Sequence, residues 1–215
     1  METLMSIKDL TKSYGDEKVL EHLTFDIYAG EILVVLGVSG AGKSTLLNIL
    51  SGLEKDYSGR VEWRDKVFEQ CEVPLPIVFQ DFDQLLPWYT VEKNILLPYR
   101  RKVLAPKDME IIAFLGLEAH LKKYPHELSG GMKQRVAIGR SLLSDGQIIF
   151  MDEPFGSLDN QRRQQLQALI IDINERYGRT IVFITHDIQE AKYLASRIGV
   201  IDEAGHFRII EKETL

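Results

Sequence analysis

The sequence predicts an α/β fold built around a buried parallel β-sheet. Continuously apolar segments, among them residues 31–37, 147–152 and 180–186, alternate with segments of helical periodicity. This alternation is typical of strands that helices cover on both faces. In addition, the glycine-rich segment GVSGAGKST, residues 37–45, stands between one of these strands and a helix. Phosphate-binding loops occupy that position in nucleotide-binding α/β proteins.

The predicted elements follow the chain in order. Apolar runs or alternating polarity predict strands at residues 6–15, 23–30, 31–37, 58–70 (one or two strands), 75–80, 147–152, 180–186 and 197–202. Helical periodicity predicts helices at residues 90–101, 107–117, 129–143, 159–177 and 187–196. The three consecutive helical segments between residues 90 and 144 interrupt the alternation, which predicts a helical insertion.

Composition narrows the function classes. The chain has 215 residues, of which 45% are hydrophobic and 27% charged, as in a soluble globular protein. Its net charge of −6 argues against a nucleic-acid partner. Cys71 is the single cysteine, so no intrachain disulfide can form and a reducing cytoplasm is expected. No apolar run approaches the roughly 20 residues that span a bilayer, so we expect any membrane contact to be peripheral.

The glycine-rich loop carries the strongest chemical signal. It matches the pattern G-x-x-x-x-G-K-[ST], in which consecutive backbone N–H groups surround phosphate oxygens. Lys43 is expected to reach the β- and γ-phosphates, and the Ser44 hydroxyl to ligate Mg²⁺. The alternative is a glycine turn with a surface lysine. The candidate nucleotide-binding residues here are Gly37, Ser39, Gly40, Ala41, Gly42, Lys43, Ser44 and Thr45.

Two acids end the apolar segment QIIFMDE. Asp152 is placed as the second protein ligand of Mg²⁺, and Glu153 as the group that accepts a proton from an attacking water. A pair of acids after a strand is otherwise a solvated turn. The phosphate-binding loop favours the functional interpretation, because both features belong at the carboxyl edge of the same sheet.

Three more polar residues stand at predicted strand ends. His186 could donate to a γ-phosphate, or could simply precede Asp187 as a helix N-cap. Tyr14 could present its ring to a base, or pack at the strand end. Gln80 could ligate Mg²⁺ or orient water, although a single glutamine carries little weight.

A second anion cradle lies far along the chain. The segment LSGGMKQRVAIGR, residues 128–140, passes from a polar turn through two glycines into a basic helix. The N-terminus of a helix favours anions, so Ser129, Gly130 and Gly131 form a second candidate phosphate site.

These motifs together resemble the ATP-binding subunit of an ABC transporter, over essentially the whole chain. LSGGMKQ is similar to the ABC signature, and motif order and spacing agree. The resemblance implies one ABC domain over residues 1–215, with a RecA-like P-loop NTPase core. An antiparallel β subdomain would share residues 1–80 and 146–215 with that core, and an inserted α-helical subdomain would cover about 81–145.

The resemblance also implies residue roles. Tyr14 is implied to stack on adenine, Gln80 to touch Mg²⁺ and couple to the membrane subunit, and Asp159 in FGSLD to be the D-loop aspartate. His186 is implied to be the switch histidine and Glu153 the general base. In ABC proteins the signature of one subunit closes on ATP held by the P-loop of the other. Ser129, Gly130 and Gly131 would thus serve the ATP of a homodimer partner.

The segments VFQDFDQLLPWYTVEKNI and HELSGGMKQRVAIGRSLL are similar to the nitrate/sulfonate/taurine importer branch. That similarity implies an ATPase that uses ATP and Mg²⁺, binds integral membrane permease subunits, and works indirectly with a solute-binding protein. It implies a cytoplasmic location on the inner face of the cell membrane. The alternatives are a soluble ABC ATPase, an exporter or lipoprotein-release ATPase, and a nucleotide-binding regulator without turnover.

The sequence departs from the family pattern at two positions, and it contains one apolar cluster near Gln80. Val38 replaces a frequent proline, and Gly139 replaces a frequent alanine at an expected cost of about 0.5–1 kcal/mol. Leu85, Leu86 and Trp88 in LLPWY are expected either to dock the membrane subunit or to pack within the helical lobe.

Overall fold

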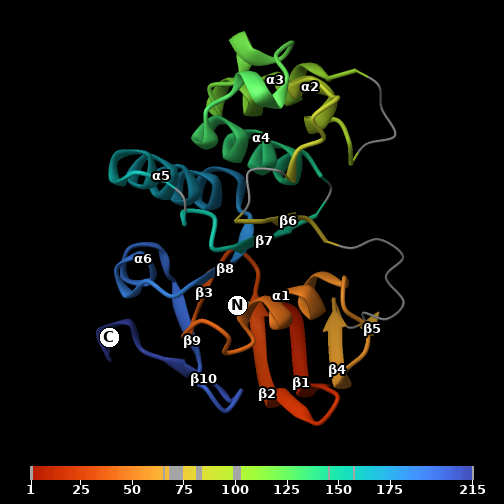
Figure 1. Cartoon of the computed structure of the whole chain (residues 1–215), viewed down its shortest axis with the longest axis vertical. Coiled ribbons are helices and arrows are strands. Elements are labelled where there is room, and N and C mark those ends of the chain that lie inside the picture. The colour runs from red at the N-terminus through yellow and green to blue at the C-terminus, as the bar shows by residue number, and fades with distance from the viewer. Residues whose placement is uncertain are drawn as a thin grey trace.

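The computed structural model describes residues 2–64, 66–67, 75–80, 84–98, 103–144, 146–156 and 158–214, so Cys71 lies outside the described residues. A six-stranded sheet in the order β10-β9-β3-β8-β7-β6 forms the centre of the molecule (Figure 1). Its strands are β3 (Ile32–Leu36), β6 (Ile77–Val78), β7 (Ile148–Asp152), β8 (Thr180–Thr185), β9 (Arg197–Ile201) and β10 (Phe207–Ile210).

The predicted α/β fold is confirmed, because five of these strands pair in parallel, from β9 to β6. The antiparallel edge strand β10 was not predicted. Its four residues are half-buried or exposed, so they lack the apolar run that marks the inner strands. Phe207 nevertheless ties β10 to the neighbouring sheet, where its ring stacks on Phe25 with centroids 4.1 Å apart.

A four-stranded antiparallel sheet in the order β2-β1-β4-β5 lies beside the central sheet. It contains β1 (Thr3–Tyr14), β2 (Glu17–Tyr28), β4 (Ser58–Trp63) and β5 (Lys66–Val67). The first two strands begin earlier than the predicted 6–15 and 23–30, because irregularities in the β1–β2 register break the strict alternation that marks a strand in sequence. A tight turn at Gly15, with φ 60°, joins them.

The helices are α1 (Lys43–Ser51), α2 (Val91–Ile95), α3 (Pro106–Phe114), α4 (Gly130–Leu143), α5 (Asn160–Tyr177) and α6 (Ile188–Leu194), with the 3-10 turns η3 (Glu118–His120), η4 (Pro125–Glu127) and η5 (Lys212–Thr214). None of the helices in the described residues combines the length and apolarity needed to cross a bilayer. The predicted helix at 90–101 is wrong beyond Ile95, since Leu96 caps it and Pro98 opposes continuation. The predicted helix at 107–117 ends at Phe114, before Gly116 with φ 68°.

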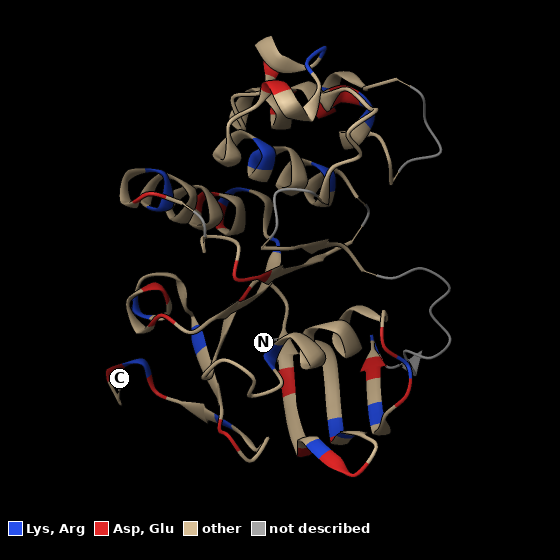
Figure 2. Cartoon of the chain, in the orientation of Figure 1, with Lys and Arg blue, Asp and Glu red and all other residues tan. Residues whose placement is uncertain are grey.

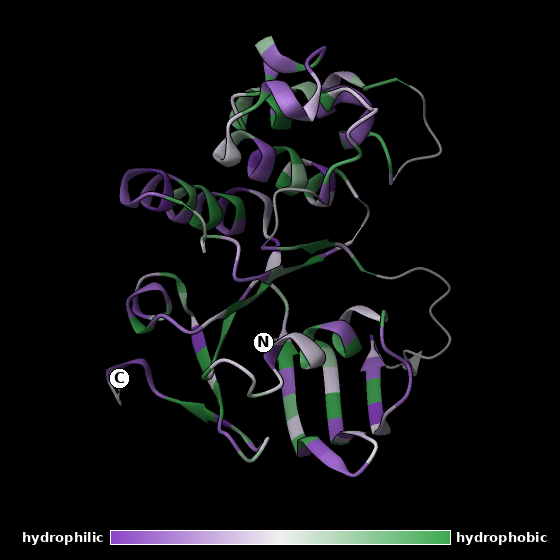
Figure 3. Ribbon diagram, in the orientation of Figure 1, coloured by the Kyte–Doolittle hydropathy of each residue, from purple (hydrophilic) through white to green (hydrophobic). Residues whose placement is uncertain are grey.

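The central sheet is covered on both faces, which explains its continuously apolar strands. Side chains at alternate positions of β3 point to opposite sides: Val34 and Leu36 join the core formed with α2 to α5, and Leu33 and Val35 join the core formed with α1 and the four-stranded sheet. The apolar colouring of the inner strands is visible in Figure 3. Helices α2, α3 and α4 gather at one end of the molecule, and the four-stranded sheet lies at the other (Figure 1).

Gly139 has a packing reason that its sequence context does not show. A Cβ at this position would lie 2.9 Å from Cδ1 of the fully buried Leu115. The glycine therefore allows α4 to approach the end of α3 closely, which offsets the loss of helix propensity.

Candidate functional site

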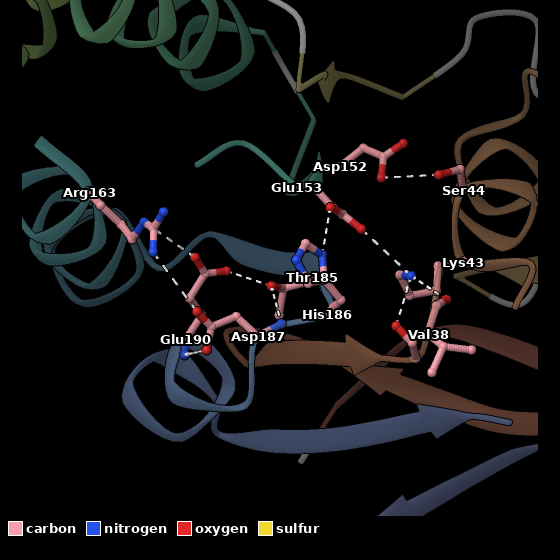
Figure 4. Close-up of polar contacts among 11 residues, drawn as sticks. Val38, Lys43, Ser44, Asp152, Glu153, Arg163, Thr185, His186, Asp187 and Glu190 are labelled. Carbon is pink, nitrogen blue, oxygen red and sulfur yellow. Dashed lines mark hydrogen bonds and ion pairs between the residues drawn. The ribbon is translucent and has the colours of Figure 1, made fainter. Parts of the chain in front are cut away.

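The parallel order of β3, β7 and β8 brings three loops to one edge of the sheet. These loops begin at Gly37, Asp152 and Thr185, each at the carboxyl end of its strand. Side chains separated by more than a hundred positions thus face one another (Figure 4). This edge is where open α/β sheets hold ligands.

The glycine-rich loop folds around its own lysine. Gly42 caps α1 in a left-handed conformation with φ 89°, and a Cβ there would lie 2.8 Å from Val19 Cγ1, so a side chain is excluded twice. Lys43 begins α1 with only 5% of its surface exposed, and its Nζ donates to the carbonyls of Gly37 at 2.9 Å and Val38 at 2.8 Å. A buried ammonium at the N-terminus of a helix, next to a glycine-rich loop, is suited to bind a polyphosphate.

Ser44 and Asp152 form an oxygen pair beside this loop. Ser44 Oγ donates to Asp152 Oδ1 at 3.2 Å (Figure 4). Burial, helped by the negative charge of Glu153, raises the pKa of Asp152, although Ser44 and Lys43 oppose the shift. A divalent cation would relieve this buried carboxylate, and hydroxyl and carboxylate oxygens are the ligands that Mg²⁺ prefers, so the two residues fit the ion.

Glu153 links the loop to the end of β8. Its Oε1 lies 3.6 Å from Lys43 Nζ, and its Oε2 lies 2.9 Å from His186 Nδ1. Its backbone has φ 42°, in the left-handed region that non-glycine residues rarely adopt, and its N–H donates to the Ile184 carbonyl at 3.1 Å. Such strain is found at functional sites, where the surrounding structure enforces it.

His186 follows β8 directly and is largely exposed, with 64% of its side chain accessible. Asp187 caps α6 through its carboxylate, so the capping interpretation is confirmed, and it coexists with the contact between His186 and Glu153. A cavity of about 710 Å³ opens here. It is lined by Leu36, Gly37, Val38, Ser39, Glu153, His186, Ile188, Val200, Ile201, Asp202 and Glu203.

Tyr14 ends β1 with 52% of its surface exposed. The buried Lys12 ammonium lies 4.6 Å from the centroid of the Tyr14 ring. Gln80 lies apart from Tyr14: its side chain approaches Gly156, where an added Cβ would meet Gln80 Nε2 at 2.6 Å. Gly156 N in turn donates to the Glu153 carbonyl at 3.2 Å, so Gln80 borders the Glu153 turn.

The second candidate phosphate site lies at the N-terminus of α4. Ser129 caps α4 by accepting from Met132 N at 3.4 Å. A hollow of about 120 Å³ lies beside it, and all of its lining comes from Ser129, α4 and α5. The lining residues are Ser129, Gly131, Met132, Arg135, Arg162, Gln165 and Leu166. No residue of the glycine-rich loop lines this hollow.

Asp159 lies next to that hollow as the N-cap of α5. Its Oδ1 accepts from Arg162 N at 2.9 Å, and its Oδ2 pairs with Arg162 Nε at 3.2 Å. The neighbouring Ser157 lies outside the described residues.

The LLPWY cluster is divided by the fold. Leu85 is 3% exposed and belongs to the core, so the expectation of one exposed cluster is wrong for this residue. Trp88 is 66% exposed, so the opposite expectation, that it packs inside the helical lobe, is also wrong. Trp88 is therefore free to contact a partner.

Sequence reasoning missed Gln134. This glutamine of α4 is fully buried, and its Nε2 donates to the carbonyls of Phe79 and Gln80 at 3.3 Å and of Pro154 at 3.2 Å. It joins the segment before Gln80 to the turn after Glu153. Its position on the inward face of α4, among apolar neighbours, was the available signal.

Residues of both charge signs occur along most of the described elements. Lys and Arg are interspersed with Asp and Glu over most elements (Figure 2).

Comparison with known proteins identifies the family to which the chain is similar. The family described as ABC transporter matches residues 20–156. The aliphatic sulfonates import ATP-binding protein SsuB of Bacillus cereus (strain ZK / E33L) is 40% identical over 196 residues, which cover 90% of this chain and 78% of that protein.

Two solved structures have the same fold. The dimeric structure of MJ0796, a bacterial ABC transporter cassette, superposes with a TM-score of 0.82 at 31% identity, covering 97% of this chain and 99% of that chain. A dimeric post-hydrolysis state of MJ0796 bound to ADP and Pi superposes with a TM-score of 0.79 at 29% identity, with the same coverage.

Proposed function

This chain belongs to the ABC transporter family as an ATP-binding, ATP-hydrolysing subunit, and we propose that it powers an importer of small anions of the sulfonate, taurine or nitrate type. The observation that carries the proposed ATP hydrolysis is the meeting of Lys43, Asp152, Glu153 and His186 at the carboxyl edge of one sheet. Lys43 binds the β- and γ-phosphates, and the loop from Gly37 to Thr45 surrounds them. Ser44 and Asp152 hold Mg²⁺, with Gln80 as a further contact.

Catalysis in this proposal is a proton transfer assisted by charge stabilisation. Glu153 accepts the proton of the attacking water, and His186 donates to the γ-phosphate. When bound, Mg²⁺ would neutralise part of the negative charge of the phosphates. The exposed Tyr14 ring stacks on adenine, which the 52% exposure of this residue permits.

The proposed working unit is a homodimer. Ser129, Gly130 and Gly131 then contact the γ-phosphate of the partner's ATP, and Asp159 lies at the same interface. The separation of the two cradles supports this arrangement, since the hollow beside Ser129 contains no P-loop residue. The dimeric state of the MJ0796 cassette supports it as well.

Membrane coupling and subdomains belong to the same proposal. The segment from Gln80 to Tyr89 docks integral permease subunits through the exposed Trp88, which holds the chain at the inner face of the membrane. A solute-binding protein delivers the solute to the permease. The helical subdomain of about 81–145 moves against the core and β subdomain of about 1–80 and 146–215. The anion class rests on the 40% identity to an aliphatic sulfonate importer subunit.

The test of hydrolysis is phosphate release by the purified chain with ATP and Mg²⁺, alone and with its permease. Release that needs Mg²⁺ and disappears in Lys43→Ala supports an ATPase, whereas nucleotide binding without turnover in either condition supports a regulator. The test of transport is uptake in cells that lack the gene. Loss of sulfonate, taurine or nitrate uptake supports the importer, and unchanged uptake of all three contradicts the anion assignment.

A further inference from the structure

We propose that Glu190 is a positioning residue for His186, holding the turn that carries this histidine and linking it through Arg163 to helix α5. The inference rests on the proposed function in one respect, namely that His186 acts at the γ-phosphate. The side chains of Glu190 and Arg163 both reach the turn after β8, where they meet Thr185 and Asp187 (Figure 4).

Thr185 is the fixed point of this turn. It is the last residue of β8, only 2% exposed, and its Oγ1 donates to Glu190 Oε2 at 2.5 Å. The same hydroxyl accepts from Asp187 N at 3.0 Å. Asp187 in turn accepts from the N–H of Glu190 at 3.4 Å. These hydrogen bonds tie Thr185, Asp187 and Glu190 together, and His186 is the residue between Thr185 and Asp187.

His186 itself has little else to hold it. Its side chain is 64% exposed, and the contact described for its ring is with Glu153, at 2.9 Å. The position of the imidazole therefore depends on the backbone of the turn, which the hydrogen bonds among Thr185, Asp187 and Glu190 fix. A displacement of about 1 Å at a catalytic group costs up to about a hundred-fold in rate, so this backbone has functional weight.

Arg163 joins the turn to another part of the site. Its Nε lies 3.8 Å from Glu190 Oε1, and its NH1 lies 4.0 Å from Asp187 Oδ2. Arg163 stands in the first turn of α5, where its N–H donates to the carbonyl of Asp159 at 2.9 Å. A movement of the Asp159 end of α5 is thus transmitted to the two acids that hold the His186 turn.

The burial of the Glu190 carboxylate makes this link sensitive to small shifts. Glu190 has 8% of its side chain exposed, and within the described part of the chain the buried Arg163 Nε has no hydrogen-bond partner. A buried donor without an acceptor is unfavourable. Motion of α5 that brings this Nε within hydrogen-bond distance of Glu190 is consequently favoured, which couples the approach of α5 to the seating of His186.

The primary test is Thr185→Val, which removes the hydroxyl and keeps the shape. We expect kcat to fall about ten-fold while the KM for ATP stays within roughly three-fold, because the group is misplaced and binding is intact. The side-chain ¹⁵N signal of His186, assigned with a His186→Ala sample, should move in the nucleotide-free protein. Thr185→Ser, which restores the hydroxyl, should return both readouts to the parent values.

Thr180→Val is the matched control on the same strand. Thr180 is 1% exposed and accepts from Gly30 N at 2.8 Å, but it lies at the opposite end of β8. The control should lose a buried hydrogen bond without altering the His186 signal or kcat. An equal fall of kcat in Thr180→Val and Thr185→Val would overturn the positioning role in favour of a general structural one.

A second pair of variants keeps the proposal testable if Thr185→Val does not fold. Arg163→Met and Glu190→Gln each remove the same ion pair, so each should lower kcat roughly two- to five-fold, and their combination should add little. Parent kcat and a parent His186 signal in folded Arg163→Met overturn the proposal. If the parent chain itself releases no phosphate, the proposed function fails, while the His186 signal still decides the placement.

Discussion

Lys43 and Glu153 face each other across the carboxyl edge of the sheet, with 3.6 Å between Nζ and Oε1. The ammonium also donates to the carbonyls of Gly37 and Val38. In this arrangement the cation neutralises the carboxylate that is proposed to act as the base. Binding of a polyphosphate would draw Lys43 toward the phosphates, and Glu153 would then be available to an attacking water.

Glu153→Gln should preserve ATP binding and lower turnover by a factor on the order of 10²–10⁴, the range for a lost general base. The amide keeps the size of the side chain but cannot take up a proton. ATP binding is measured by equilibrium titration and turnover by phosphate release. The ATP-bound dimer should accumulate, as seen by size-exclusion chromatography. Hydrolysis at the parent rate would remove Glu153 from the role of base.

Asp152→Asn should stabilise the nucleotide-free chain at neutral pH and abolish Mg²⁺-dependent turnover. Burial raises the pKa of Asp152 in the folded state, so the folded chain retains this proton to a higher pH than the unfolded chain. The contribution to stability is full below the ordinary aspartate pKa and is lost as pH rises through the raised value. Ionised Asp152 therefore penalises the folded state at neutral pH.

The measurement for Asp152→Asn is a series of thermal melts from acidic to neutral pH without nucleotide. The variant should exceed the parent in Tm near pH 7, and the difference should shrink as pH falls toward the ordinary aspartate range. A variant that is less stable than the parent at pH 7 would contradict the assignment of burial as the dominant effect.

Trp88→Ala should leave the fold and the basal ATPase intact and remove stimulation by the permease. Trp88 is exposed, so its truncation opens no cavity, whereas a large exposed aromatic is a typical anchor at an interface. Phosphate release with and without permease gives both rates. Leu85→Ala is the contrasting variant, because Leu85 is in the core and its truncation should cost about 2–5 kcal/mol of unfolding free energy. Full stimulation of Trp88→Ala by permease would show that docking lies elsewhere.

A mixture of Lys43→Ala and Gly131→Asp should form an ATP-dependent dimer that neither variant forms alone. In the mixed dimer one shared site contains both substitutions. The other site combines the intact Lys43 of one chain with the intact Gly131 of the other. A Cβ at Gly131 would lie 3.8 Å from Arg162 Cδ, an ordinary contact, so Gly131→Asp is expected to fold. Its carboxylate repels the γ-phosphate of the partner's ATP.

The mixed dimer is best followed in a Glu153→Gln background by size-exclusion chromatography, since closure precedes hydrolysis. A site completed within one chain would leave each subunit inactive in its own way. Failure of two folded variants to form any ATP-dependent mixed dimer would rule out shared sites.

Gly139→Ala should fail to stabilise the chain despite the higher helix propensity of alanine. The gain of about 1 kcal/mol is opposed by overpacking against Leu115, which typically costs about 1–3 kcal/mol. In a Leu115→Ala background the same change should stabilise by about 1 kcal/mol, because the obstructing methyl is absent. Urea unfolding of all four chains measures the coupling. If Gly139→Ala raises the unfolding free energy of the parent chain by about 1 kcal/mol, the close approach of Gly139 to Leu115 does not limit stability.

The sequence by itself determined the features that depend on local backbone preferences and periodicity. Gly42 and Lys43 shape the phosphate-binding loop through the left-handed glycine and the helix that begins after it. Ser129 and Asp187 cap α4 and α6 as their residue types favour. The continuously apolar strands predicted a parallel sheet, because a strand that is buried on both faces shows no alternation of polar and apolar residues.

Only the tertiary structure decided which residues meet. Ser44 and Asp152 are 108 positions apart, yet a hydrogen bond joins them because β3 and β7 both pair in parallel with β8. The same packing buried Leu85, exposed Trp88, shortened α2 and bound Thr185 to Glu190. Periodicity describes one element at a time, whereas these outcomes depend on which surfaces of different elements exclude water together.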